Sequence, residues 1–316
     1  QVALPGGELV TVTRESDPPL DWFVAAEGTL GVITQIELTV RPRPASESHH
    51  LFAFDDLNVL GQTVAALARV EPRPFTIFFA DSGYLRLLAR AGFHIPLDLP
   101  QPQSPIGEKG VLLVSFQGEP PEVSRGKDSL VRVAGRELSS ELALEEWSLR
   151  LYHLRTKRAG PSLLAAEVWL PLDKLQNYLK SVKNLAERHR LLIGTYGLAV
   201  TSNVALAMSL YPTDERHTIE YLAAIGFTKR LHDLAARCGG RPYGVGLWNS
   251  AYLPRLFSRT RLDELKRRKA RLDPLGIMNP GKLYHASFPL WPITFGLGAS
   301  VLGAAHIMLA HGGERP

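Results

Sequence analysis

The residues best suited to hold a ligand form a turn that contains two glycines. It reads Glu27, Gly28, Thr29, Leu30, Gly31, Val32 and Ile33. Gly28 and Gly31 carry no Cβ, so the backbone here can take a positive φ and approach a ligand closely. The free N–H groups of such a turn attract anionic oxygens, which favours a phosphate group as the ligand. An ordinary tight turn into a strand would use the same residues, and the short motif alone leaves both interpretations open.

Two stretches far apart in the chain carry a resemblance to a known family. One is this turn with the strand-like run to Val40 and the Pro-rich exit Arg41–Pro44, and the other is the run Leu272–Lys282, LDPLGIMNPGK. Together and in this order they resemble the vanillyl-alcohol oxidase / p-cresol methylhydroxylase family of flavoenzymes. Within that family the similarity is to the glycolate oxidase and D-lactate dehydrogenase subgroup, and it extends from Gln1 to Tyr284.

The resemblance implies FAD as the cofactor and hydride transfer from a small 2-hydroxy acid to the flavin as the reaction. It implies that the turn 27–33 lies along the adenosine and phosphates, and that Asn279 and Lys282 sit near the cofactor. As alternatives, Asn279 is a turn former before Pro280 and Lys282 is a solvated charge. The family's main phosphate-binding loop precedes the point where this sequence begins, so we expect the later part of a longer polypeptide.

The same resemblance and the hydrophobic pattern predict an α+β protein. Residues 1–45 are expected to be the C-terminal part of a PCMH-type FAD-binding domain, 46–238 an α+β, ferredoxin-like cap, and 239–285 a return segment that contacts the flavin. Strict alternation predicts a strand over Val32–Val40, and the cap pattern includes a continuous helix over Leu138–Arg155. Residues 286–316 are expected to form an apolar C-terminal helix.

Candidates for the substrate site come from several segments. An arginine can hold a carboxylate through two hydrogen bonds, which makes Arg150 the first choice and Arg155 the second. Tyr196, Tyr243 and Asn249 could orient a hydroxyl group. A solvated helix charge is the alternative role for each arginine, and ordinary packing is the alternative for both tyrosines.

The sequence departs from the 2-hydroxy-acid subgroup where that subgroup holds a divalent metal and its catalytic histidine. The corresponding stretches here are 194–198, GTYGL, and 243–246, YGVG, and neither contains a histidine or a carboxylate. Neutral imidazole and carboxylate groups are the ligands such a metal needs. We therefore expect no metal site and a mechanism without metal assistance.

The composition limits the classes of molecule that this protein is expected to bind. The formal net charge is +5, but the basic cluster 266–271 falls on an expected helix with acidic neighbours, so no nucleic-acid binding is predicted. The single cysteine, Cys238, excludes a disulfide framework and fits a cytoplasmic protein. The apolar run 293–310 is marginal in length for a membrane span, which needs about 20 such residues. A helix that spans or lies on a membrane, a buried C-terminal helix and the opening of a further domain are the alternatives for it.

Three functions stay open on the sequence alone. The first is oxidation of a small 2-hydroxy acid, with an electron acceptor that the sequence does not identify. The second is a flavin-dependent oxidase of sugar alcohols or lactones that uses oxygen. The third is a non-catalytic subunit that binds a partner, because the histidines of the subgroup are missing.

Overall fold

The computed structural model describes residues 1–93, 110–189, 191–247, 249–283, 301 and 304. They belong to two compact units. Unit 1 combines Gln1–Pro42 with Gly244–Ala299, and unit 2 combines Arg43–Tyr243 with Ser300–Pro316. The predicted apolar segment 286–316 lies outside the described residues except for 301 and 304. Within the described residues, no helix is both long and apolar enough to cross a membrane.

The described residues of unit 2 form an antiparallel sheet of eight strands with the order β11-β8-β10-β9-β5-β6-β4-β7. Its strands are β4 Ser46–Phe54, β5 Thr76–Asp81, β6 Gly110–Gly118, β7 Arg136–Glu137, β8 Ser162–Pro171, β9 Gly194–Ala199, β10 Val204–Thr213 and β11 Arg241–Pro242. Its helices are α1 Leu57–Leu67, α2 Ser82–Arg90, α3 Pro120–Asp128, α4 Ser140–Ser148, α5 Leu175–Arg188 and α6 Thr218–Arg237. Short 3-10 turns occupy Ser129–Arg132, His153–Ala159 and Leu172–Lys174. The mixture of sheet and helix agrees with the expected α+β class.

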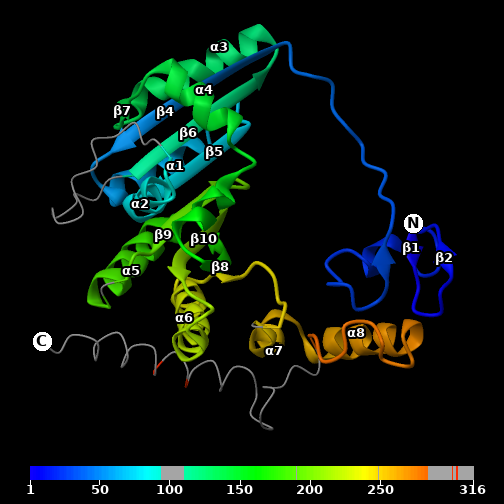
Figure 1. Cartoon of the computed structure of the whole chain (residues 1–316). Coiled ribbons are helices and arrows are strands. Elements are labelled where there is room, and N and C mark those ends of the chain that lie inside the picture. The colour runs from blue at the N-terminus through cyan, green and yellow to red at the C-terminus, as the bar shows by residue number, and fades with distance from the viewer. Residues whose placement is uncertain (94–109, 190, 248, 284–300, 302–303, 305–316) are drawn as a thin grey trace, which may run out of the picture. The chain divides into compact units, whose positions relative to one another are not determined.

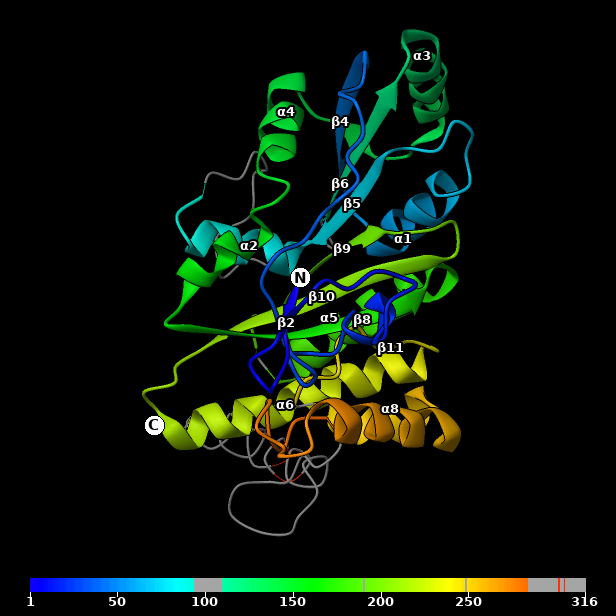
Figure 2. The ribbon, with the colours of Figure 1, turned by 90° about the vertical axis from the view of Figure 1, so that its right-hand side faces the viewer.

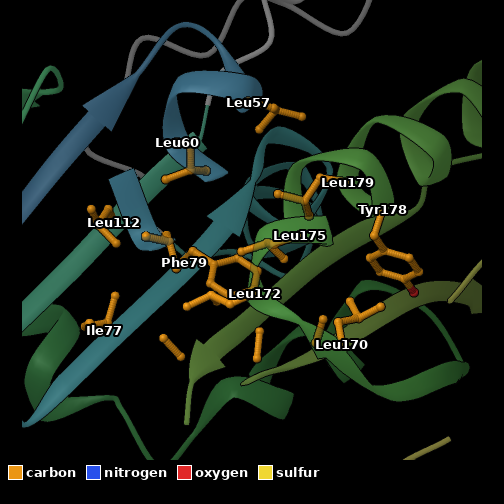
Figure 3. Close-up of a cluster of buried hydrophobic side chains, with 14 of the residues drawn as sticks. Leu57, Leu60, Ile77, Phe79, Leu112, Leu170, Leu172, Leu175, Tyr178 and Leu179 are labelled. Carbon is orange, nitrogen blue, oxygen red and sulfur yellow. The ribbon is translucent and has the colours of Figure 1, made fainter. Parts of the chain in front are cut away.

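The larger core of unit 2 lies between the sheet and the helices α1, α5 and α6. Alternate residues of the strands point into it, and Phe79 and Leu112 are completely buried there. Figure 3 shows these side chains in one cluster with Leu60 of α1 and Leu175 of α5, and Tyr178 of α5 lies further along it near Leu170. A second core covers part of the opposite face beneath α2 and α4, and Figure 2 shows these two helices on the side of the sheet away from α1 and α5. The sheet is therefore packed on both faces over part of its width.

The helix predicted over Leu138–Arg155 is wrong, because α4 ends at Ser148 and a 3-10 turn begins at His153. Ser148 is exposed. A continuous helix would have placed Arg155 on the same face, since residues seven apart share a side of a helix. The break instead lets Arg155 turn inward, where only 2% of its surface is exposed.

Unit 1 is much smaller, and Figure 1 shows its elements drawn from both ends of the described chain. They are β1 Val2–Ala3, β2 Leu9–Val10, β3 Val32–Ile33, α7 Leu253–Leu256 and α8 Arg259–Leu272, with 3-10 turns at Leu20–Trp22 and Ser250–Tyr252. The three strands form a sheet with the order β2-β1-β3. Ser258 caps the start of α8 by accepting a hydrogen bond from the Arg261 amide.

The strand predicted over Val32–Val40 is also wrong beyond its first two residues. The Thr34 amide still donates to the Gln1 carbonyl, 3.0 Å away, but the described structure assigns no strand to 34–45. The apolar side chains of the alternating pattern, Ile36, Leu38 and Val40, are between 66% and 83% exposed. The pattern is that of a strand, but strand geometry is maintained by hydrogen bonds to a neighbour, and β1 is too short to supply them.

Candidate flavin and substrate site

The glycine turn of unit 1 has the unusual backbone that the sequence suggested. Glu27 and Gly28 have positive φ values of 53° and 68°. The Thr29 amide and hydroxyl both donate to the Ala26 carbonyl, at 3.0 and 2.6 Å. Because a positive φ is costly for a residue with a Cβ, Glu27 must be held in place by its contacts.

The loop after α8 is organised around one buried ion pair. Lys269 pairs with Asp273, one turn later, and its ammonium group also donates to the carbonyls of Met278 and Thr29 at 2.6 and 2.9 Å. The Asp273 carboxylate in turn accepts from the amides of Ile277 and Met278, at 3.0 and 2.8 Å. Lys269 therefore ties the loop 273–282, called the closing loop below, directly to the glycine turn 27–33.

Asp273 is ionised despite its burial. Burial alone would raise the pKa of this carboxyl group. The hydrogen bonds from Lys269 and from the two loop amides, together with the charge of Lys269, outweigh that effect and hold the pKa below its ordinary value. The loop thus contains a fixed negative charge balanced by a fixed positive one.

Glu27 is the point where three segments of unit 1 meet. Its carbonyl accepts a hydrogen bond of 2.6 Å from the Asn279 side chain, and its carboxylate accepts one of 2.8 Å from the Gly246 amide. The second carboxylate oxygen lies 3.5 Å from the Lys282 ammonium group. The structure therefore brings the predicted residues Glu27, Asn279 and Lys282 together, although they are far apart in sequence.

The two glycines of the turn are required by the protein's own packing. A Cβ on Gly28 would lie 2.8 Å from the Asn279 amide nitrogen, and one on Gly31 would lie 2.7 Å from a Val2 methyl group. Close approach of a ligand is therefore not needed to explain these two glycines. The space beside Gly31 is taken by β1, and the space beside Gly28 is taken by Asn279. Leu30 is buried in the small core of this unit, while Val32 and Ile33 are about half exposed.

What unit 1 offers a cofactor is a backbone turn flanked by polar groups. Gly28 is exposed, and the Lys282 side chain is one-third exposed beside the turn. An amide turn next to a lysine suits an anionic phosphate. These residues fit the phosphate-bearing part of FAD, with Gly28 supplying the accessible backbone and Lys282 a positive charge that it shares with the Glu27 carboxylate, 3.5 Å away.

The two candidate arginines of unit 2 occupy different environments. The guanidinium group of Arg150 lies 4.1 Å from the centre of the Trp147 ring and donates to the Trp147 carbonyl at 2.9 Å. Arg155 is buried, and one of its nitrogens lies 2.9 and 2.8 Å from the two carboxylate oxygens of Glu146. The charge of Arg155 is therefore already paired, whereas Arg150 is partly exposed and makes its described contacts with Trp147.

Tyr196 and Tyr243 lie in unit 2, and Asn249 lies in unit 1. Tyr196 is 8% exposed and packs against Tyr84 and His153, with ring centres 4.9 and 5.0 Å away. Tyr243 is 51% exposed. The side chain of Asn249 donates to the Gly244 carbonyl at 2.9 Å, which closes a local turn.

The cap stretch that lacks the subgroup's histidine carries a buried hydrogen-bond network instead. The Thr195 hydroxyl lies 3.0 Å from that of Ser209, which lies 3.0 Å from the Tyr178 hydroxyl. The Thr195 amide donates to Asp81, whose burial raises its pKa to about 6. Gly197 leaves room for the Phe79 ring, which would lie 2.5 Å from an added Cβ. Among the described residues, no three His, Cys, Asp or Glu side chains gather as metal ligands.

Comparison with known proteins identifies the class. Residues 43–283 match the family model described as FAD linked oxidases, C-terminal domain, so the chain belongs to the FAD-linked oxidases. The cofactor of this family is FAD, and the resemblance inferred from the two motifs is confirmed.

Two curated relatives show which members of the family the chain is similar to. The chain is 26% identical over 273 residues to the glycolate oxidase subunit GlcD of Bacillus subtilis, covering 83% of this chain and 56% of the relative. It is 23% identical to a D-lactate dehydrogenase of Anaerostipes hadrus, covering 89% of this chain and 62% of the relative. The chain thus spans little more than half the length of these relatives.

Solved structures support the fold. A substrate-bound p-cresol methylhydroxylase superposes with a TM-score of 0.66 at 13% identity, over 89% of this chain and 63% of the other. A 4-ethylphenol oxidase from Gulosibacter chungangensis superposes with a TM-score of 0.65 at 15% identity, over 89% and 64%. At such identities the likeness establishes the architecture alone.

Sequence reasoning missed the residues that organise the closing loop. Lys269 and Asp273 are four apart on a helix, a spacing that favours an ion pair, and this signal was available in the sequence. The hydrogen bond between Gly246 and Glu27 could not be foreseen, because it joins residues with a separation of 219 in the chain.

Proposed function

We propose that the polypeptide carrying this sequence oxidises a small 2-hydroxy acid of the glycolate or D-lactate type. The observation that carries the proposal is the junction at Glu27, where the glycine turn and the closing loop join through Asn279 and Lys282. The two motifs that resemble those of flavoenzymes, 27–33 and 272–282, are thus in direct contact at Glu27. The names of the relatives support the substrate class.

When bound, FAD accepts the hydride from the carbon that bears the hydroxyl group. In this proposal, Gly28 and the backbone of 27–33 bind the phosphate-bearing part of the cofactor, and Lys282 balances its charge. Asn279 maintains the turn by holding the Glu27 carbonyl. Electrons then leave to a protein or membrane acceptor.

Arg150 is the residue proposed to bind the substrate carboxylate. The Trp147 ring orients its guanidinium group, and it has no carboxylate partner among the described residues. Arg155 is less suited, because Glu146 already neutralises it. Tyr196, Tyr243 and Asn249 remain candidates for orienting the substrate hydroxyl.

Anaerobic reduction of the flavin tests the proposal. The natural polypeptide that carries this sequence is reconstituted with FAD and mixed with glycolate, D-lactate and related 2-hydroxy acids while the visible absorption is followed. Bleaching of the oxidised flavin band by one of these acids is the expected result. Arg150→Met should raise the substrate Kd at least tenfold, whereas Arg132→Met, at the end of an exposed turn, should not change it.

A second candidate is oxidation of an uncharged alcohol with oxygen as the acceptor. It is favoured by the cap stretch 194–198, where the subgroup's histidine is replaced by the Thr195 network. Oxygen consumption with sugar alcohols or lactones, combined with no bleaching by any 2-hydroxy acid, would favour this second function over the first.

A further inference from the structure

One face of strand β8 differs from the other in its exposure. Ala166, Val168 and Leu170 are completely or almost completely buried. The alternating residues on the opposite face, Glu167 and Trp169, are only half buried. Because side chains alternate across a strand, Glu167 and Trp169 point away from the main core. Around Glu167 and Trp169, this face of β8 is therefore the less covered one.

The register of the sheet places Glu167 in one row with Tyr196. Glu167 is directly opposite Met208 of β10, and Met208 is directly opposite Tyr196 of β9. Residues that pair across antiparallel strands lie on the same face. Three residues from three strands thus form a row on the face opposite the main core, where Glu167 and Met208 are half-buried and Tyr196 is 8% exposed.

Glu167 is the group in this row without a counter-charge. Within the described residues, no hydrogen bond or ion pair of its carboxylate is seen, and burial raises its pKa. A half-buried carboxylate without an ion-pair partner is costly, which often marks a functional group.

The Tyr196 hydroxyl is held only weakly. It donates to the sulfur of Met208 at 3.2 Å, and a thioether is a poor acceptor. An oxygen atom of a ligand between Tyr196 and Glu167 would be a better partner for this hydroxyl. Burial, and the nearby charge of Glu167, raise the pKa of Tyr196, so that it remains a hydrogen-bond donor.

The neighbouring residues complete the surroundings of the row. The Tyr243 amide donates to the Glu167 carbonyl at 2.9 Å, and its ring centre lies 5.3 Å from that of Trp169. Arg241 of β11 is exposed and opposite Trp169, which places it on the same face. The face therefore offers an aromatic wall, a cation and a carboxylate.

We propose that Glu167 accepts the hydroxyl proton of the substrate and that Tyr196 donates a hydrogen bond to the same substrate oxygen. This inference rests on the proposed oxidation. The O–H bond breaks and its proton moves to a Glu167 oxygen, the C–H bond breaks and its hydride moves to the oxidised flavin, and a carbonyl bond forms. Glu167 would thereby do the work of the histidine that the stretches 194–198 and 243–246 lack.

The decrease of the flavin reduction rate at low pH then reports the ionisation state of Glu167. Only the ionised carboxylate can accept a proton, so the rate constant of flavin reduction should fall as the pH drops through the raised pKa of Glu167. The other ionisable groups beside Glu167 are Tyr196, Tyr243 and Arg241, with His232 of α6 on the opposite face. Burial lowers the pKa of His232 to about 4, so it is neutral over most of this range.

The test compares Glu167→Gln with the wild type and with Glu145→Gln, which changes an exposed glutamate of α4. Glu167→Gln should lower the rate constant of anaerobic flavin reduction at least 100-fold, the usual contribution of a general base, and remove its acid limb. The flavin spectrum and the Kd of the 2-oxo acid product should stay within threefold of the wild type. Tyr196→Phe should lower the rate constant about tenfold.

A second readout does not depend on activity. The infrared carboxyl band of Glu167 is identified in the flavin-free protein as the band that Glu167→Gln removes. This band should titrate at a higher pH than that of an ordinary glutamate. Its midpoint should coincide with the pH at which the rate of flavin reduction falls. If Glu167→Gln does not fold, Glu167→Asp must lower the rate constant at least tenfold while preserving the acid limb.

The outcomes separate the two claims. Reduction by Glu167→Gln within threefold of the wild type, or a band that titrates like an exposed glutamate, overturns the role of Glu167 alone. A wild-type protein that binds FAD and is reduced by no 2-hydroxy acid overturns the proposed function and this inference together.

Discussion

The two units of the chain differ most in how much apolar surface each buries by itself. The eight-stranded sheet of unit 2 has a core on each face, and residues such as Phe79 and Leu112 are completely buried. The described part of unit 1 has one small core cluster, formed by Val2, Phe23 and Leu30, and three further buried apolar residues, Tyr252, Leu253 and Leu283. Burial of apolar surface is the main driving force of folding, so unit 2 can stand alone and unit 1 is marginal.

Unit 1 also exposes apolar side chains that a stable unit would bury. Ile36, Leu38 and Val40 alternate along the segment after β3 and are largely exposed. A cluster of exposed apolar residues usually marks a surface that another structure covers. We infer that these side chains of unit 1 are covered by a further structure or by a ligand, whereas unit 2 buries its apolar faces within itself.

The largest expected effect is in the core of unit 2. Phe79→Ala removes a fully buried ring between the sheet and α1, and should lower the free energy of unfolding of unit 2 by about 4 kcal/mol. Denaturant unfolding, with hydrogen exchange of β5 to assign the transition, measures this loss. A loss below about 1 kcal/mol would contradict the close packing of the unit 2 core around Phe79.

A smaller effect is expected at the ion pair of unit 1. Asp273→Asn removes the charge that balances Lys269 and should destabilise the closing loop by about 2 kcal/mol, with no change in unit 2. Since the folded pKa of Asp273 is lowered, its contribution is complete above the ordinary aspartate pKa and is lost as the pH falls below about 4. The measurement compares amide hydrogen exchange in 269–283 of unit 1 with that in strand β5, residues 76–81 of unit 2, in the wild type and the variant. Equal changes in both segments would contradict the separation of the units.

The acid sensitivity of unit 2 should depend partly on His153. Burial, and next the charge of Arg155, lower its pKa to about 4, so the folded state binds fewer protons than the unfolded state between about pH 4 and 6.5. Stability is therefore lost as the pH falls through this range, partly offset by Asp81, whose pKa is raised. His153→Phe keeps the stacking on Phe78 and should reduce the loss between pH 7 and 5 by about 1–2 kcal/mol. Unfolding curves of both proteins at the two pH values measure it, and parallel losses would show that His153 is accessible to protons when folded.

The smallest effect is expected on the exposed segment of unit 1. Leu38→Lys should change the free energy of unfolding of this chain by less than about 0.5 kcal/mol, because the side chain is 76% exposed. In the natural polypeptide, the same substitution should weaken FAD binding if the segment is covered there. A large loss of stability in this chain alone would show that the segment already packs against unit 1.

The sequence predicted more of unit 2 than of unit 1. The strand and helix positions of unit 2 follow from periodicity, because its elements bury their apolar faces within the chain, as α1 and β6 do. Periodicity failed for Val32–Val40, since an alternating pattern needs a paired neighbour to become a strand. It also failed at Arg155, where the ion pair with Glu146 accompanies the break after α4.

The site was predictable where a motif is local. The turn 27–33 and the loop around Asn279 and Lys282 were recognised as motifs, and the structure joins them at Glu27. Glu167 could not be found in this way, because its neighbours Met208 and Tyr196 are set by the pairing of β8, β10 and β9. Sheet register is a tertiary property, and a single glutamate in a strand gives no signal of it.

The most direct test of the account is FAD binding by the natural polypeptide, measured by titration and visible absorption. Asn279→Ala, which releases the Glu27 carbonyl, should weaken FAD binding at least tenfold, and Asn177→Ala, on the exposed side of α5, should leave it unchanged. The account predicts this difference because Asn279 holds the turn that we propose to bind the cofactor. Equal affinities of Asn279→Ala and the wild type, or no FAD binding at all, would contradict it.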